Sequence, residues 1–187
     1  MKKLLTTLLA FSLLGISGCD EQKLTQSSAK FDEPFQTALS KYNSEQYQEA
    51  FDDFKELADK GYAPAELKVV EMLLDGKGIR RNEPLAVDRL KKSAEKGEVA
   101  MQYRLGEFYY SGQLNRLPKD YHQAKNLFEK AAEKKHSPAQ LRLGEMYQNG
   151  WGTSQNKQTA KEWFGKACDN GSQKGCEQYR TLLEQGY

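Results

Sequence analysis

Histidine and cysteine are scarce in this sequence, and many catalytic and metal sites depend on them. The 187 residues include two histidines and three cysteines. Neither His122 nor His136 has partner residues at the spacing of zinc ligands, and both positions suit solvated turns. The Gly-x-Ser-x-Gly motif and the glycine loop that cradles phosphates are missing as well. We therefore predict that the protein is not an enzyme and holds no metal or cofactor.

Neither sign of charge is in clear excess. The chain has 28 basic residues against 26 acidic ones, and the basic residues do not gather into a stripe. Nucleic-acid-binding proteins need such a stripe to neutralise phosphates, and anionic lipid is attracted by polybasic patches. We therefore expect neither nucleic acid nor a charged lipid headgroup as the partner.

Long apolar runs are also missing, with one exception at the start of the chain. Leu4–Ile16 is mostly apolar, follows two lysines, and is too short to span a bilayer comfortably. We interpret residues 1–18 as an export signal. The four residues that end at Cys19 (Ile-Ser-Gly-Cys) resemble the bacterial lipobox. This resemblance implies that the signal is removed and Cys19 is acylated; an ordinary signal peptide with a chance cysteine is the alternative.

The lipobox resemblance places the mature protein at a membrane surface. Without the signal, the chain carries 26 basic and 26 acidic residues. Residues 20–30 are polar, and we expect a flexible tether with a reach of roughly 18 Å for about 11 residues. Asp20 resembles the signal that retains enteric lipoproteins in the inner membrane. We therefore expect a periplasmic protein at the inner membrane, with the outer membrane as the alternative.

Small and apolar residues recur along the rest of the chain at intervals of 36 and 38 residues. Ala86, Ala124 and Ala160 form one such set, and the sets four and eight residues later are also apolar. A period of this length without a strand signal is typical of a helical solenoid. We predict an all-α, right-handed α-solenoid of stacked antiparallel helix pairs, which offers an extended face to a partner.

The repeat divides the folded part of the chain, residues 31–187, into five segments. These are a first helix pair at 31–61, units at 62–97, 98–135 and 136–171, and a polar capping helix at 172–187. Glycines separate the two helices of each unit. The middle unit has two extra residues in this loop, around 111–120, which accounts for the single interval of 38 residues.

The third unit resembles a Sel1-like repeat, a relative of the tetratricopeptide repeat. The residues that carry the resemblance are Ala139, Leu143, Gly144, Tyr147, Gly150, Gly152, Ala160, Trp163, Phe164, Lys166, Ala167 and Gly171. The middle unit matches well, whereas the first has Val70 and Leu73 in place of the family's Gly and Tyr. The first helix pair is closer to a tetratricopeptide unit. The resemblance implies this fold and a role in protein–protein interaction.

Two cysteines remain once Cys19 is assigned to the lipid, and they lie close together in the sequence. In an oxidising compartment, Cys168 and Cys176 are typical of a structural disulfide, because a turn at 169–172 would bring two helix ends together. Closing so short a loop contributes roughly 2–3 kcal/mol to stability. A redox-active pair is the alternative, although that usually has Cys-x-x-Cys spacing.

The first helices of the units are expected to line the concave surface of the solenoid. The helical register directs nine residues there: Leu67, Glu71, Leu74, Tyr103, Glu107, Tyr110, Leu141, Glu145 and Gln148. The capping helix adds Glu177, Thr181 and Glu184. The glutamates of the units form an acidic row beside apolar and aromatic residues, which suits a partner with basic residues around a hydrophobic anchor. A solvated helix face is the alternative, since glutamate is a good helix former.

We predict that the membrane-anchored protein captures a protein partner on this surface. Sel1-like lipoproteins include immunity proteins that neutralise periplasmic toxins such as secreted phospholipases, and the size and anchor of this chain fit that role. An envelope adaptor or assembly scaffold is an alternative of the same kind. Cysteine-bridged relatives proposed to bind or hydrolyse cell-wall or β-lactam compounds suggest an enzyme as a third.

Overall fold

A computed structural model describes residues 19–187 of the chain, which form nine helices. The helices are α1 (Cys19–Asn43), α2 (Tyr47–Asp59), α3 (Ala63–Asp75), α4 (Glu83–Glu95), α5 (Val99–Ser111), α6 (Tyr121–Glu133), α7 (Ser137–Asn149), α8 (Lys157–Asp169) and α9 (Gln173–Glu184). The only β feature of this part is an isolated bridge between Leu114 and Leu117. None of these helices is long and apolar enough to cross a membrane.

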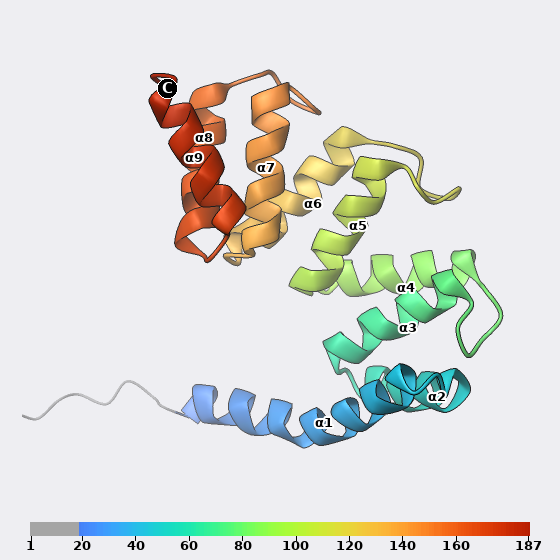
Figure 1. Cartoon of the computed structure of the whole chain (residues 1–187). Coiled ribbons are helices and arrows are strands. Elements are labelled where there is room, and N and C mark those ends of the chain that lie inside the picture. Colours follow the sequence, from blue (N-terminus) through green and yellow to red (C-terminus); the bar gives the residue numbers. More distant parts are fainter. Residues whose placement is uncertain (1–18) are drawn as a thin grey trace, which may run out of the picture.

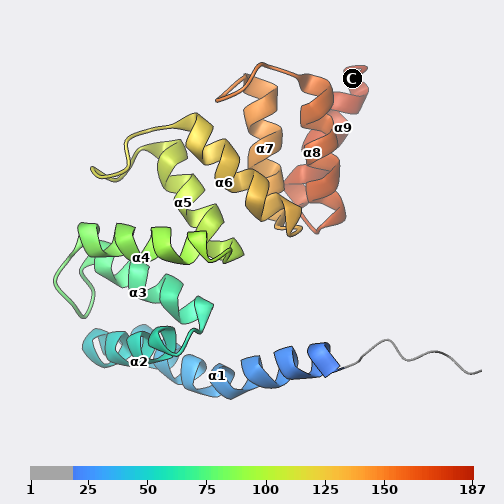
Figure 2. The same ribbon diagram turned by 180° about the vertical axis from the view of Figure 1, so that it is seen from behind.

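The helices stack as consecutive antiparallel pairs. Each helix packs against the one before it and the one after it, and α3 also touches α5. The stack is curved, with α1 and α9 at opposite ends of an arc (Figures 1 and 2). This arrangement confirms the predicted fold of stacked helix pairs.

Loop residues fix where the helices begin and end. Asn82, Asp120 and Asn156 precede α4, α6 and α8, and their side-chain oxygens accept hydrogen bonds from N–H groups of the first turn. The first helix of each unit (α3, α5 and α7) ends at a glycine with positive φ, such as 73° at Gly76 and 74° at Gly150. The same signals recur from unit to unit, so the units share one local shape.

A close approach between glycine and phenylalanine joins the two helices of a unit. A Cβ atom added at Gly144 would overlap the ring of the fully buried Phe164, and Gly106 makes the same contact in the middle unit. The first unit has Val70 and Leu90 at these positions, and both are fully buried. A larger residue on one helix is thus matched by a smaller one on the other, which explains how this unit departs from the Gly pattern and keeps a filled core.

The longer loop of the middle unit folds back onto the preceding unit. Leu114 and Leu117 are buried in the core that the first units share. The backbone N–H of Arg116 donates a 3.0 Å hydrogen bond to Glu83 at the start of α4. The two extra residues therefore add contacts between units.

The N-terminal part of the folded chain differs from the expected tether. Residues 20–30 belong to α1, which begins at Cys19 and continues through Pro34 to Asn43. The segment contains no glycine or proline and several good helix formers, so it can extend the helix. A helix is stiffer than a flexible tether, although its length is similar at about 1.5 Å per residue. The predicted export signal, residues 1–18, lies outside the described residues.

Candidate protein-binding surface

The nine predicted surface residues lie on α3, α5 and α7, the first helices of the three units. All nine are half-buried. Leu67 and Leu74 pack against the core of the first units, and Leu141 packs against that of the last. The nine residues are therefore accessible at the surface, but each apolar side chain among them is only partly exposed. We call these nine residues the inner-face set.

The two tyrosines of the set, Tyr103 and Tyr110, use part of their ring surface in packing between units. The Tyr103 ring lies 4.8 Å from the His136 ring and 5.7 Å from Phe128. The Tyr110 ring lies 5.7 Å from Trp151, in the loop of the next unit. Burial raises the pKa of Tyr103, and it raises that of Tyr110 to about 12 with help from the Glu145 charge. Both hydroxyls therefore stay protonated in the physiological range and can donate hydrogen bonds.

The predicted acidic row is not an acidic surface, because basic residues neutralise it. Arg142 forms two hydrogen bonds to Glu107, of 2.8 and 3.0 Å, and one of 2.8 Å to Glu145. The Lys174 ammonium lies 2.6 Å from Glu145. Glu71 pairs with Lys68 at 3.0 Å. The inner face therefore alternates in sign instead of carrying one negative stripe, and the expectation of a basic partner loses its support.

The central cation of this network is held firmly in its charged form. Burial alone would lower the pKa of Arg142, but the hydrogen bonds and charges of Glu107 and Glu145 outweigh it and raise that pKa. The guanidinium also lies 5.2 Å from the centre of the Tyr110 ring. Sequence reasoning missed Arg142 and Lys174. Arg142 lies 35 residues after Glu107, close to one repeat, and this spacing is the signal that would have identified it. Lys174 lies 29 residues after Glu145, so the repeat interval gives no such signal for it.

The histidines occupy different environments. His122 is exposed in the first turn of α6, as expected for a solvated position. His136 is instead half-buried, and its Nδ1 atom accepts a 3.3 Å hydrogen bond from the N–H of Ala139 at the start of α7. Burial lowers the pKa of His136. The expectation of a solvated turn was therefore wrong for His136, because the residue caps a helix and packs against an aromatic ring.

The predicted pair of cysteines forms a disulfide in the structure. Cys168 near the end of α8 is bonded to Cys176 in α9, and their Cα atoms are 4.5 Å apart. The bond ties the last helix to the helix before it. Within residues 19–187 there is no cluster of three or more histidine, cysteine or acidic side chains that could hold a metal ion.

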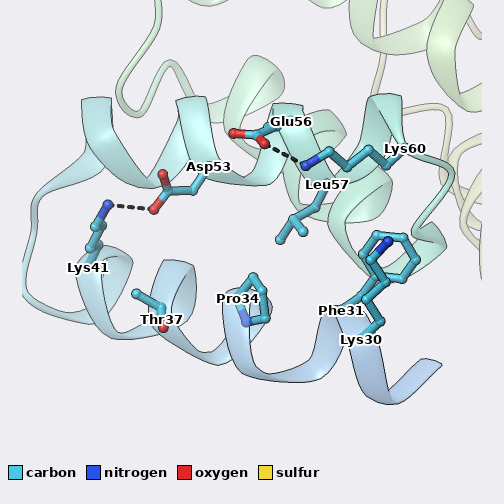
Figure 3. Close-up of a pocket in the computed structure, with 9 residues that line it drawn as sticks. All are labelled: Lys30, Phe31, Pro34, Thr37, Lys41, Asp53, Glu56, Leu57 and Lys60. Carbon is cyan, nitrogen blue, oxygen red and sulfur yellow. Dashed lines mark hydrogen bonds and ion pairs between the residues drawn. The ribbon is translucent and has the colours of Figure 1, made fainter. Parts of the chain in front are cut away.

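A second surface feature lies at the other end of the stack, between α1 and α2 (Figure 3). This hollow has a volume of about 740 Å³, and its apolar residues are Phe31, Pro34 and Leu57. Two internal ion pairs flank it, Lys41 with Asp53 at 2.6 Å and Lys60 with Glu56 at 2.5 Å. The repeat pattern did not predict this hollow, which forms where no earlier helix pair covers the stack among the described residues.

Comparison with protein families gives a match over most of the helical stack. The family described as "Sel1 repeat" matches residues 63–98, 99–136 and 137–172, which together exceed half of the chain. The matched segments coincide with the three helix pairs α3–α4, α5–α6 and α7–α8. None of the curated proteins compared with the chain matches it.

Solved structures show the same architecture. A Sel1 repeat protein from Oxalobacter formigenes is 31% identical, with a TM-score of 0.62 over 69% of this chain and 96% of that protein. The protective antigen c5321 of uropathogenic Escherichia coli, described as displaying an SLR fold, is 28% identical with a TM-score of 0.63. That match covers 73% of this chain but 33% of the antigen. Helicobacter pylori cysteine rich protein B is 25% identical, with a TM-score of 0.54 over 68% of this chain and 95% of that protein.

Proposed function

Since the chain belongs to the Sel1 repeat family, whose scaffold typically mediates protein–protein interactions, we propose that it captures a protein partner on its inner face. The observation that carries this proposal is the charge network that crosses the unit boundaries. Glu107 lies on α5, Arg142 and Glu145 lie on α7, and Lys174 lies on the capping helix α9, so charges of alternating sign run across these helices. They hold α5, α7 and α9 side by side, so the surface is organised before a partner arrives.

The composition of this surface suggests what the partner offers. Half-buried Tyr103, Tyr110 and Leu141 expose apolar edges beside charges of both signs. Aromatic and arginine side chains are the residues that most often dominate binding energy in interfaces. The partner is therefore a protein that contributes an apolar anchor and both hydrogen-bond donors and acceptors, and it need not be basic.

An affinity purification from native membranes tests the inner face. The variant Gln148→Arg with Glu177→Arg places new positive charge on α7 and α9, at positions whose side chains make at most one weak hydrogen bond. It is expected to lose the partner while keeping its melting temperature. The control Asn126→Arg with Glu133→Arg makes the same charge change at exposed positions of α6 and is expected to keep it. Equal recovery with both variants would rule out the inner face.

Substitution of Tyr103 or Glu107 is a poor test of binding. Tyr103 packs against Phe128 and His136, and Glu107 is bonded to Arg142. Replacing either would change the packing between units as well as the surface. A loss of binding in such a variant would therefore not distinguish contact with the partner from local unfolding.

We also propose that the protein is a periplasmic lipoprotein, anchored through Cys19. The support is the apolar run followed by the lipobox-like residues that end at this cysteine. Metabolic labelling with radioactive palmitate is expected to mark the wild type, and the variant Cys19→Ser is expected to remain unlabelled and to leave the membrane fraction. Equal labelling of both proteins would contradict acylation at this position.

The biological role that fits these features is immunity against a secreted toxin such as a phospholipase, with an envelope adaptor as the alternative. A gene for a secreted lipase or nuclease next to this one favours immunity. Co-expression then protects cells from that toxin, and the inner-face variant fails to protect. Protection unaffected by the variant, or hydrolysis of cell-wall fragments or β-lactams by the pure protein, would overturn the proposal.

A further inference from the structure

A second hollow lies away from the inner face, between α2, α3, α4 and the loop that joins α3 to α4. Figure 1 shows this loop at its right. Its volume is about 510 Å³. Phe51, Val69 and Leu73 line it but are only 6%, 1% and 1% exposed, so its accessible apolar surface comes mainly from Ile79 and Leu85. Ile79 and Leu85 lie at its edge with 37% and 42% of their surface exposed. The hollow shares no residue with the inner-face set.

All charged residues that line this hollow are basic: Lys55, Arg80, Arg81 and Arg89. Carboxylates pair with three of them from outside the lining. Asp59 lies 2.8 Å from Lys55, Glu66 lies 2.6 Å from Arg89, and Glu83 lies 3.6 Å from Arg81. Arg80 is exposed and has no ion pair among the described residues. An anionic group that enters the hollow would therefore meet one basic side chain without an ion pair among the described residues, Arg80, and three that already have a carboxylate partner. The longest of these pairs is that of Arg81.

The loop that carries Ile79, Arg80 and Arg81 is held in place. A Cβ atom added at Gly78 would overlap the backbone of Tyr47 at the start of α2, so the loop lies directly against that helix. The N–H of Asn82 donates a 2.8 Å hydrogen bond to the carbonyl of Leu73. The exposure of Ile79 is thus part of an ordered surface.

The corresponding loop of the third unit shows that the repeat fold does not require these residues. Its glycines have φ values of 74° and 67°, against 73° and 71° in the first unit. Its closing residue, Asn156, donates the same 2.8 Å hydrogen bond, to Tyr147. The two loops therefore share one conformation.

The residues at matching positions have a different chemistry. Where the first unit has Ile79, Arg80, Arg81 and Leu85, the third has Thr153, Ser154, Gln155 and Thr159. Where it has Phe51, Lys55 and Arg89, the third has Lys125, Glu129 and Trp163. None of the four basic positions is basic in the third unit, and neither exposed aliphatic residue is retained. The same backbone thus forms without a basic or aliphatic rim.

From this contrast we infer that the hollow is a docking site for an acidic peptide segment that carries one aliphatic or aromatic anchor. The anchor fills the space over Phe51 and Leu73, next to Ile79 and Leu85. Carboxylates on either side of the anchor meet Arg80, Arg81 and Lys55. Burial of the apolar anchor and attraction between opposite charges both favour binding. This site is separate from the inner face, so one molecule of this protein could bind two partners at the same time.

Fluorescence anisotropy of the full chain tests this inference with labelled short peptides. The peptides contain one leucine, isoleucine, phenylalanine or tryptophan flanked by glutamates; matched peptides carry alanine at the anchor or lysines at the flanks. At least one acidic peptide is expected to bind with a Kd below about 1 mM. Its affinity should fall at least tenfold when the anchor becomes alanine and should decrease as salt is added.

The decisive variant transfers the third-unit residues into the first unit. Ile79→Thr with Arg80→Ser and Arg81→Gln keeps residues that this loop conformation already accepts, so the fold is expected to survive with an unchanged melting temperature. Peptide binding should weaken at least tenfold. The control Lys130→Ser with Lys134→Gln removes two exposed positive charges, one from α6 and one from the residue that follows it, and should leave binding unchanged.

Several outcomes would overturn the inference. These are no acidic peptide with a Kd below about 1 mM, equal binding of the lysine-flanked peptides, or a transfer variant that binds as tightly as the wild type. Vesicles of phosphatidylglycerol provide a further arm. Binding to such vesicles that exceeds binding to the peptides and disappears in the transfer variant would assign the hollow to a lipid surface, and so would contradict the peptide site.

Discussion

The guanidinium of Arg142 in α7 forms a bidentate pair with the carboxylate of Glu107 in α5. Nε lies 2.8 Å from Oε1, and Nη2 lies 3.0 Å from Oε2. The remaining Nη1 atom bonds to Glu145, which in turn pairs with Lys174 of α9. The side chains of Glu107 and Glu145 are 22% and 15% exposed. Paired geometry of this kind is stronger and more directional than a surface ion pair, so it sets the relative position of three helices.

Removal of Arg142 is expected to destabilise the stack. The variant Arg142→Met keeps much of the aliphatic stem. It removes both hydrogen bonds to Glu107 and leaves Glu145 with Lys174 alone. We expect a loss of about 2–3 kcal/mol in the free energy of unfolding, measured by urea denaturation, because hydrogen bonds to charged groups are lost. Lys92→Met, which breaks the exposed pair with Asp88, should cost less than about 0.5 kcal/mol. Similar losses for both variants would show that the Arg142 network has no special role.

Glycine at position 144 is expected to be required by the phenylalanine that it faces. Gly144→Ala forces a methyl group against Phe164 and should destabilise the protein by about 1–3 kcal/mol. Phe164→Leu alone leaves a void and should also destabilise it. The double variant copies the Val70 and Leu90 pairing of the first unit in milder form, so it should lose less than the sum of the two changes. An additive double-mutant cycle would contradict this matched packing.

The stability of the protein should depend on the protonation of His136. Burial lowers its pKa below the ordinary value of 6.5, so the unfolded chain binds the proton more readily. The contribution of neutral His136 is complete above that ordinary value and is lost as the pH falls towards the pKa in the folded state. Protonation also removes the Nδ1 acceptor that caps α7.

The variant His136→Asn isolates this effect, because asparagine can cap the helix but does not titrate. Melting temperatures measured between pH 7.5 and 5.5 should fall less for the variant than for the wild type. His136→Ala loses the cap and should be less stable at every pH, by about 1 kcal/mol. Parallel pH profiles for the wild type and the asparagine variant would show that His136 does not contribute.

Reduction of the Cys168–Cys176 disulfide is expected to loosen the end of the stack. The bond closes a short loop between α8 and α9, and the chain-entropy argument gives about 2–3 kcal/mol for it. Hydrogen exchange after reduction should accelerate in α9 well before it changes in α3–α6, because helices in a solenoid contact only their neighbours. Uniform acceleration, or none in α9, would contradict a local role.

The small residues of the repeat were sufficient to predict the helix pairs. Ala124, Ala139 and Ala160 recur where helices approach closely, and all three are fully buried. The closeness of Cys168 and Cys176 followed from the same register, since it places them on either side of a turn. The helix pairs and the cysteine pair could be predicted because they depend on the spacing of residues along the chain.

The charge of the inner face could not be obtained in the same way. The helical register placed its glutamates in the correct row. The partner of Glu107 comes from another unit, because the long side chain of Arg142 on α7 extends to α5, and the register of a single helix does not show such a contact. The half-buried position of His136 was missed because its ring packs against Tyr103, which comes from another helix. The helix over residues 20–30 was missed because polar composition alone does not separate a tether from an exposed helix.

The central claim, capture of a protein partner on the inner face, is tested most directly by site-specific photo-crosslinking in living cells. A photoreactive phenylalanine analogue in place of Gln148 on α7 should yield a discrete covalent adduct with one envelope protein. The same analogue in place of the exposed Asn126 on α6 should yield none. An adduct that forms only from position 126, or equally from both positions, would contradict the claim.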